Sequence, residues 1–181
     1  MHRLISFKNK FLAFFYVLAV LAFVSLLSTD FLMDAKDAPV QFLYTQRYGF
    51  SDFLFKMSAA PLALSAFFFY GKPSLSVLPI TSASLYDAFS KTEFLVIGTH
   101  GEDGNIITDD NVWVGPPVQR HSQLRFIYFG SCNLGLKIEA WQKAFPSAII
   151  RAYYRVIYPV EGWRYLYFQS WMDLMKVKMA R

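Results

Sequence analysis

The chain contains few residues that could support covalent catalysis or metal binding. Cys132 is its only cysteine, so no internal disulfide can form and the thiol is free in any compartment. No pair of histidine or cysteine residues has the spacing of a zinc site, and no recognisable nucleic-acid-binding module is present. We therefore expect no metal, no cofactor and no nucleic-acid partner.

Apolar residues are abundant instead, at 55% of the 181 residues, and part of the excess is local. Residues 11–27 contain two hydroxyl groups, those of Tyr16 and Ser25, and no charge. As a helix this run is about 26 Å long, close to the roughly 30 Å of a bilayer core. Basic residues precede the run and Asp30, Asp34 and Asp37 follow it, which predicts a cytoplasmic amino terminus.

We interpret residues 1–28 as an uncleaved signal anchor, a single transmembrane helix that delivers the rest of the chain to the extracytoplasmic (periplasmic) side. The membrane lipid around this helix is then one partner of the chain. A cleaved signal peptide is the alternative, although no small-x-small cleavage site follows the run cleanly.

A second apolar stretch, residues 57–70, is short, contains Pro61 and is flanked by charges, which disfavours a second membrane span. Its second half, Ala63 to Tyr70, is predicted to be a buried strand. Residues 29–59 are interpreted as a juxtamembrane connector and residues 60–181 as the globular domain.

The carboxyl-terminal part is basic. From Lys137 to Arg181 there are eight Lys and Arg residues and three acids. This indicates either contact with anionic lipid headgroups or an ordinary solvated helix face, and the sequence favours neither.

Further elements follow from the apolar pattern. Helices are predicted over residues 82–90, over 136–145 and after Pro159, and strands over residues 94–98, 125–129 and 148–154. A hairpin is predicted around Asp109 and Asp110, with arms at residues 105–108 and 111–114. Alternation of strands and helices predicts an α/β fold with a mostly parallel sheet and helices packed on its faces.

Two look-alike segments, 32 positions apart, carry the chemistry. Phe94-Leu-Val-Ile-Gly-Thr-His100-Gly101 and Phe126-Ile-Tyr-Phe-Gly-Ser-Cys132 are each an apolar run followed by small residues and one reactive side chain. Parallel strands bring their carboxyl ends to the same sheet edge, where ligands bind in open α/β folds. His100 and Cys132 would then face each other as acid-base partner and nucleophile.

These segments resemble the caspase-like cysteine peptidases, namely caspases, metacaspases, gingipains, clostripain, separase and the bacterial CHAT domains. Thr99-His-Gly-Glu-Asp-Gly-Asn-Ile-Ile is similar to the His-bearing loop, and Gly130-Ser-Cys-Asn-Leu-Gly135 is similar to the bacterial Cys loop. The resemblance covers about residues 63–155 and implies a three-layer caspase-like sandwich.

By the same resemblance, Cys132 is the nucleophile and His100 the general acid-base. The amides of Gly101 and Cys132 would form the oxyanion hole. The implied activity is peptide-bond hydrolysis on a peptide or protein substrate.

Four acids lie close to the proposed site in sequence: Glu102, Asp103, Asp109 and Asp110. They would either select a basic residue of the substrate or form a solvated hairpin. Their spacing fits no EF-hand loop.

Three functions stay open, of which the third is a small membrane-surface module held by its anchor and its basic terminal helix. The first is a membrane-anchored caspase-like cysteine endopeptidase of bacterial type. The second is a non-catalytic caspase-like domain that acts as a scaffold or subunit of a membrane protein complex, which the small size of the domain and its many aromatic residues favour.

Overall fold

The computed structural model describes residues 32–33, 35, 37–47 and 52–180, and these form an α/β fold around one parallel sheet. The sheet has five strands in the order β2-β1-β3-β7-β8, and every neighbouring pair is parallel. The strands are β1 (Val40–Tyr44), β2 (Leu75–Pro79), β3 (Phe94–Gly98), β7 (Phe126–Gly130) and β8 (Ile149–Arg151). The prediction of an α/β fold with a mostly parallel sheet is confirmed.

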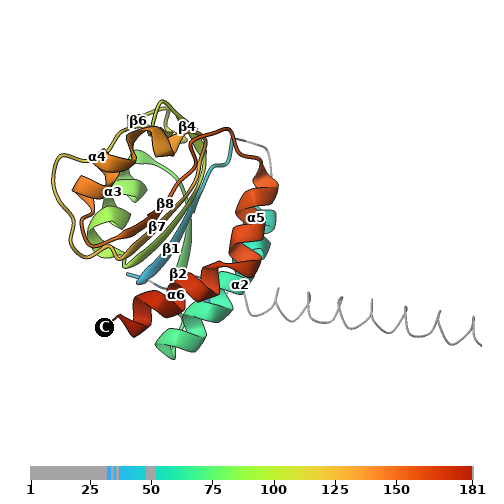
Figure 1. Ribbon diagram of the computed structural model, residues 1–181. Coiled ribbons are helices and arrows are strands. Elements are labelled where there is room, and N and C mark those ends of the chain that lie inside the picture. Colours follow the sequence, from blue (N-terminus) through green and yellow to red (C-terminus); the bar gives the residue numbers. More distant parts are fainter. Residues whose placement is uncertain (1–31, 34, 36, 48–51, 181) are drawn as a thin grey trace, which may run out of the picture.

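Helices cover both faces of the sheet (Figure 1). On one face lies the α2–α5–α6 layer, built from α2 (Asp52–Tyr70), α5 (Pro159–Phe168) and α6 (Ser170–Met179). On the other lies the α3–α4 layer, built from α3 (Ser82–Lys91), α4 (Ile138–Ala144) and the short 3-10 helix η1 (Leu134–Lys137) that precedes α4.

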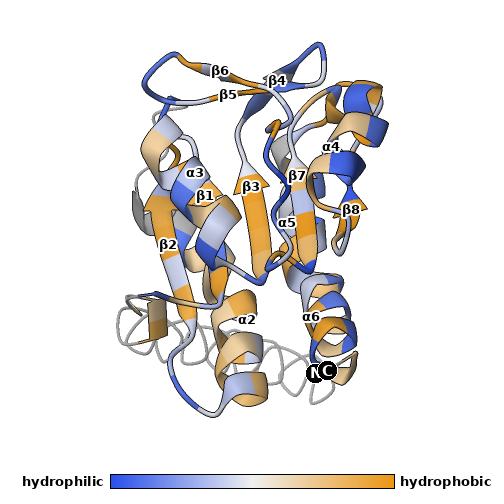
Figure 2. Cartoon of the chain, turned by 90° about the vertical axis from the view of Figure 1, so that its left-hand side faces the viewer, coloured by the Kyte–Doolittle hydropathy of each residue, from blue (hydrophilic) through white to orange (hydrophobic). Residues whose placement is uncertain are grey.

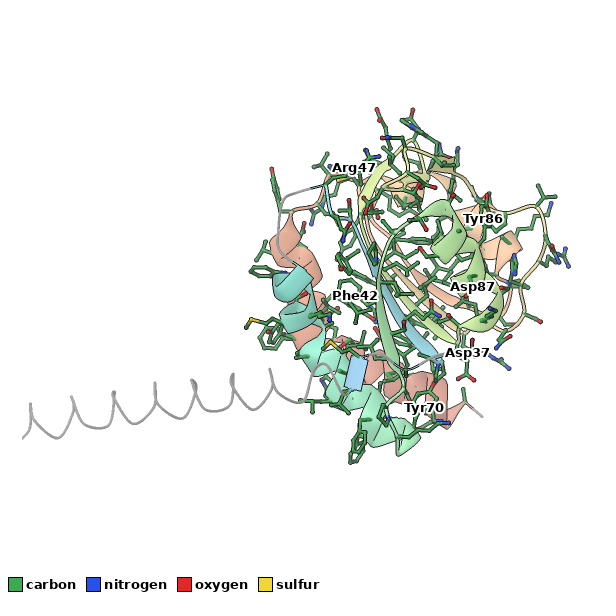
Figure 3. The ribbon with its side chains drawn as sticks, turned by 180° about the vertical axis from the view of Figure 1, so that it is seen from behind. Asp37, Phe42, Arg47, Tyr70, Tyr86 and Asp87 are labelled. Carbon is green, nitrogen blue, oxygen red and sulfur yellow. The ribbon has the colours of Figure 1, made fainter. Side chains whose placement is uncertain are left out.

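The strands are apolar on both sides because both of their faces are buried. On β1, Phe42 points toward the α2–α5–α6 layer and Leu43 toward the α3–α4 layer. In Figure 3, Phe42 lies on the side of the sheet that faces α2, whereas Tyr86 and Asp87 belong to α3 on the other side. The alternating side chains of the central strands β1, β3 and β7 therefore contribute to two separate hydrophobic cores.

Several predicted elements are confirmed. The helix expected over residues 82–90 is α3, which begins at a capping box between Thr81 and Ser84. The strands expected at residues 94–98 and 125–129 are β3 and β7. The helix expected over residues 136–145 is η1 followed by α4.

The prediction of a strand from Ala63 to Tyr70 is wrong, because these residues form the second half of α2. The buried residues of α2 recur at helical spacing, as Ala59, Leu62, Ala63 and Ala66 show. A run that is apolar on every side carries no period from which helix and strand can be told apart. The strand in this part of the chain is β2, which follows α2.

The boundary between a connector and a domain at residue 60 is also wrong. β1 lies inside the segment 29–59 and is paired on one side with β2 and on the other with β3. The α/β domain therefore begins before residue 60. With only five residues and a polar Gln41 as the second of them, β1 shows too little apolar pattern to be recognised in isolation.

The single terminal helix expected after Pro159 is divided at Gln169 into α5 and α6. Leu166 and Leu174 are buried, whereas Trp163, Tyr167 and Trp171 are 48%, 49% and 46% exposed. The two helices therefore bury leucine residues and present aromatic residues to solvent.

The anchor predicted at residues 1–28 lies outside the described residues. Among the described helices, none has the combination of length and apolar character that crossing a membrane requires.

Candidate functional site

The predicted pair, His100 and Cys132, lies at the carboxyl ends of two neighbouring strands. β3 and β7 are paired in register, so Gly98 is opposite Gly130, and each reactive residue follows two positions later. Both residues are partly buried. The structure therefore brings the His loop and the Cys loop to the same edge of the sheet, the edge at which ligands bind in open α/β folds.

The two loops are in direct contact through Gly101. A Cβ atom on Gly101 would lie 2.3 Å from the carbonyl oxygen of Cys132 and 2.2 Å from Cδ2 of Leu134. Any larger residue would push the loops apart. Gly101 is thus required by the close approach of two backbones, which is one of the two standard reasons for a glycine.

After His100 the chain forms a small antiparallel sheet, β4 (His100–Glu102), β5 (Asn105–Ile107) and β6 (Trp113–Val114). Figure 2 shows it lying across one end of the main sheet, near α4. The predicted hairpin with arms at 105–108 and 111–114 is confirmed as β5 and β6.

The β4–β5 hairpin, which the sequence reasoning missed, decides how Gly101 is oriented. Its two-residue turn, Asp103-Gly104, has φ angles of 48° and 74°, as a type I′ turn requires. Residues that flank such a turn form a hydrogen-bonded pair, so the next pair, Gly101 with Ile106, is a non-hydrogen-bonded one. The N–H of Gly101 therefore points away from β5, as an oxyanion-hole donor must.

The tip of this hairpin is fastened to the helix that follows the Cys loop. The indole N–H of Trp141 donates to the carbonyl oxygen of Gly104 at 3.0 Å, and Nζ of Lys137 donates to Oδ1 of Asn105 at 2.7 Å. A buried indole bond and a charge-assisted bond thus hold the segment after His100 against the segment after Cys132.

The Cys132 thiol has a backbone partner that the sequence did not indicate. The N–H of Ile157 donates to Sγ at 3.4 Å, and the thiol donates to the carbonyl oxygen of Ile157 at 3.8 Å. Alternate residues of the same segment bind the rest of the Cys loop: the carbonyl oxygen of Arg155 accepts from the N–H of Asn133, and that of Tyr153 accepts from the N–H of Gly135. We call residues 153–157 the covering segment.

Asp109 has a structural role. It accepts hydrogen bonds from the hydroxyl of Thr45 at 2.6 Å and from the N–H of Gln46 at 2.9 Å, and its carboxylate lies 3.8 Å from Nε of Arg47. Figure 3 shows Arg47 at this end of the sheet. Asp109 therefore ties the end of β1 to the small sheet.

Asp110 joins the small sheet to the start of α3. It accepts from the N–H of Ser82 at 3.0 Å and from its hydroxyl at 2.6 Å. Hydrogen bonds from the side chains of Ser82 and Thr108 lower the pKa of Asp110 to about 2. The other two acids, Glu102 and Asp103, are exposed on the β4–β5 hairpin beside His100.

The described part of the chain contains no group of three His, Cys, Asp or Glu residues that could hold a metal ion. Comparison with protein-family models, with curated proteins and with solved structures gives no significant match. The functional conclusions therefore depend on the geometry of these residues.

Proposed function

We propose that the chain is a caspase-like cysteine endopeptidase, with Cys132 as nucleophile and His100 as general acid-base. The observation that carries the proposal is the contact between Gly101 and the backbone of Cys132, at the ends of two strands paired in register. It holds a histidine and the only cysteine of the chain on adjoining loops.

The proposed reaction proceeds in two steps. In the first, the Cys132 sulfur attacks the carbonyl carbon of the scissile peptide bond, and His100 takes the thiol proton and gives it to the departing amine. The N–H groups of Gly101 and Cys132 stabilise the oxyanion that forms. In the second, water attacks the thioester with His100 as base, which releases the carboxylic acid and restores the thiol.

Substrate binding requires the covering segment to move. An extended peptide that brings its carbonyl carbon to Sγ would take the position that the backbone of Ile157 occupies. Glu102 and Asp103, exposed on the hairpin, are the acids available to a basic side chain of such a peptide. Asp109 and Asp110 are already engaged with Thr45, Gln46 and Ser82.

The second candidate function is a non-catalytic caspase-like domain that acts as a scaffold or subunit of a membrane complex. The bonds of Cys132 with both backbone groups of Ile157 favour it, because they satisfy the thiol within the fold. The two candidates differ in whether His100 affects the reactivity of Cys132.

For either function, we propose that residues 1–28 anchor the chain in a bacterial membrane with the α/β domain on the extracytoplasmic side. The support is the uncharged run at residues 11–27, with basic residues before it and acidic residues after it.

Alkylation of Cys132 with iodoacetamide tests the proposal, since any label on the full chain must be on this residue. We expect His100→Ala to slow labelling at neutral pH by at least about tenfold, because a histidine partner promotes thiolate formation. His121→Ala, which changes a histidine within the α3–α4 layer, is the matched control and should not slow it. Equal labelling rates in all three proteins would leave the scaffold as the better description.

Cleavage provides the second measurement. The reconstituted full chain is incubated with a peptide library, and products are identified by mass spectrometry. Cys132→Ala and His100→Ala should each abolish cleavage while leaving the circular dichroism spectrum unchanged. Products that persist in Cys132→Ala would overturn the assignment of the nucleophile.

A further inference from the structure

The outer surface of the α2–α5–α6 layer is unusually apolar. Among the described residues, ten of the twenty exposed large hydrophobic residues lie on its three helices, whereas α3, η1 and α4 together carry two, Tyr86 and Leu136. The helices lie together on one side of the sheet (Figure 1), so their outward sides belong to one surface. The ten residues are Leu64, Phe67, Phe68, Val160, Trp163, Tyr167, Phe168, Trp171, Met172 and Met179.

The composition of this surface is that of an interfacial lipid-binding helix. Trp163, Tyr167 and Trp171 are each about half exposed, and such side chains have an apolar ring and a polar group that suit the boundary between lipid and water. Isolated exposed apolar residues need no explanation, but a gathering of this size marks a contact surface.

The charges on α5 and α6 leave a positive balance. Of the two acids, Glu161 is paired with Arg155, and Asp173 is buried and paired with Arg151 at 2.8 Å. Nζ of Lys176 also lies 3.3 Å from Oδ1 of Asp173. Arg164 is exposed on α5.

Lys178 lies at the junction of α6 with α2. Its Nζ is 3.9 Å from the centre of the ring of Tyr70, which Figure 3 shows near the end of α2. Arg164 and Lys178 thus add positive charge to the helices that carry the apolar surface, and this charge complements anionic phospholipid headgroups.

The proposed anchor would hold this layer close to a bilayer. Leu32 and Met33 are buried in the same hydrophobic core as the inner sides of α2, α5 and α6. The apolar run ends at residue 27, so four residues, 28–31, separate the two. Even fully extended, four residues reach only about 14 Å.

We propose that the outer surface of the α2–α5–α6 layer lies on a bilayer that contains anionic phospholipids, with Trp163, Tyr167 and Trp171 at the level of the headgroups. The proposal depends on the anchor proposed for residues 1–28, and not on catalysis by Cys132. The opposite layer then faces the aqueous phase.

Tryptophan quenching by lipid tests this orientation in the full chain. The protein is reconstituted into phosphatidylcholine/phosphatidylglycerol vesicles with or without brominated acyl chains. One variant keeps Trp171 (W113F/W163F), and the matched control keeps Trp113 of β6 (W163F/W171F). Trp113 and Trp171 are similarly exposed, at 53% and 46%, and both variants retain the buried Trp141 as a constant background.

We expect brominated lipid to remove about half of the emission of the variant that keeps Trp171, and almost none from the control, because bromine quenches only on contact at the interface. Equal quenching of the two variants, or none in either, would overturn the proposal. An unquenched Trp171 that crosslinks to a second copy, or to residues 11–27 of its own chain, would identify a protein segment as the occupant instead.

Two separate measurements distinguish this proposal from the proposed anchor and from the proposed catalytic site. Flotation of the full chain with vesicles after alkaline carbonate extraction tests the anchor: failure there overturns the anchor and this proposal together, whereas flotation with an unquenched Trp171 overturns this proposal alone. Alkylation of Cys132 tests the site, and its outcome does not affect the quenching ratio.

Discussion

The two helical layers of the sheet differ in where they place their aromatic residues. On the α3–α4 side of the sheet, the rings of Phe89, Phe129, Trp141 and Phe145 are completely buried, and two of their ring pairs are 4.9 Å apart. In the α2–α5–α6 layer, Trp163, Tyr167 and Trp171 are on the outside. Both sides of the sheet bury a hydrophobic core, but the α2–α5–α6 layer also exposes several of its aromatic rings.

The interior of the α2–α5–α6 side is also more polar. Asp173 is buried there beside Arg151, and the ring of Tyr165 stacks on that of Tyr128 with centroids 3.7 Å apart. Burial raises the pKa of both tyrosines, so both hydroxyls stay neutral well above their ordinary range. A buried ion pair adds little to stability, and its more general use is to specify one arrangement of neighbours.

The comparison explains where the candidate site lies. Ile106, Val114 and Leu134, which support the small sheet and the Cys loop, all belong to the core of the α3–α4 side. The core of the α3–α4 side therefore supports the loops that carry His100 and Cys132, and the proposed membrane contact lies on the other side. Three predictions sharpen this division.

The largest effect is expected from removing a core aromatic residue on the site side. Trp141→Ala should lower the free energy of unfolding by about 3–5 kcal/mol, because it leaves a cavity and removes the bond to Gly104. Trp171→Ala, on the exposed surface, should change it by less than about 0.5 kcal/mol. Urea unfolding of the full chain in detergent measures both, and similar losses would contradict the division.

The second prediction compares Gly101, on the side of the candidate site, with Gly162 of the α2–α5–α6 layer. Gly101→Ala places a methyl group against the backbone of Cys132 and should cost about 1–3 kcal/mol of stability, with a changed rate of Cys132 alkylation. Gly162→Ala in α5 meets open space and should instead stabilise the protein by about 0.5–1 kcal/mol. Thermal unfolding measures the two shifts, and a Gly101→Ala variant as stable as the parent would refute the close approach.

The smallest effect concerns Asp110, whose pKa of about 2 lies below the ordinary 3.8. A carboxylate with a lowered pKa stabilises the folded state above its unfolded pKa, and this contribution is lost as the pH falls from about 4 to about 2. Asp110→Asn should flatten the dependence of stability on pH in that window.

Ser82→Ala is the matched variant for Asp110. It keeps the carboxylate but removes one hydroxyl donor, so it should flatten the same window to a smaller extent. Acid titration of the circular dichroism signal measures both variants, and an unchanged titration in Asp110→Asn would contradict the role of the Ser82 and Thr108 hydrogen bonds.

Much of the sheet could be predicted from the sequence, because a strand covered on both faces reads as a continuous apolar run. Phe94–Gly98 and Phe126–Gly130 have this pattern and were recognisable individually. Val40–Tyr44 is equally buried but stands beside the predicted connector, with Gln41 interrupting its run. Whether residues 63–70 formed a helix or a strand could not be decided, since the choice depended on which neighbouring segment completed the sheet.

The candidate site, like the sheet, could be predicted only in part from the sequence. The two look-alike segments were enough to place His100 and Cys132 at one sheet edge. Each residue follows its strand by two positions, and the strands are parallel and paired in register. The bonds between Cys132 and Ile157 could not be foreseen, since the two residues are 25 positions apart and no local pattern links a thiol to a remote backbone.

The sequence by itself thus determined the class of fold, the two reactive residues and the apolar run before the domain, since each depends on residue type and local spacing. Only the tertiary structure decided that Gly101 touches the Cys132 backbone, that the covering segment meets the thiol, and that the aromatic residues of α5 and α6 face outward. These features depend on how segments distant in the chain pack together, and packing is a property of the whole fold.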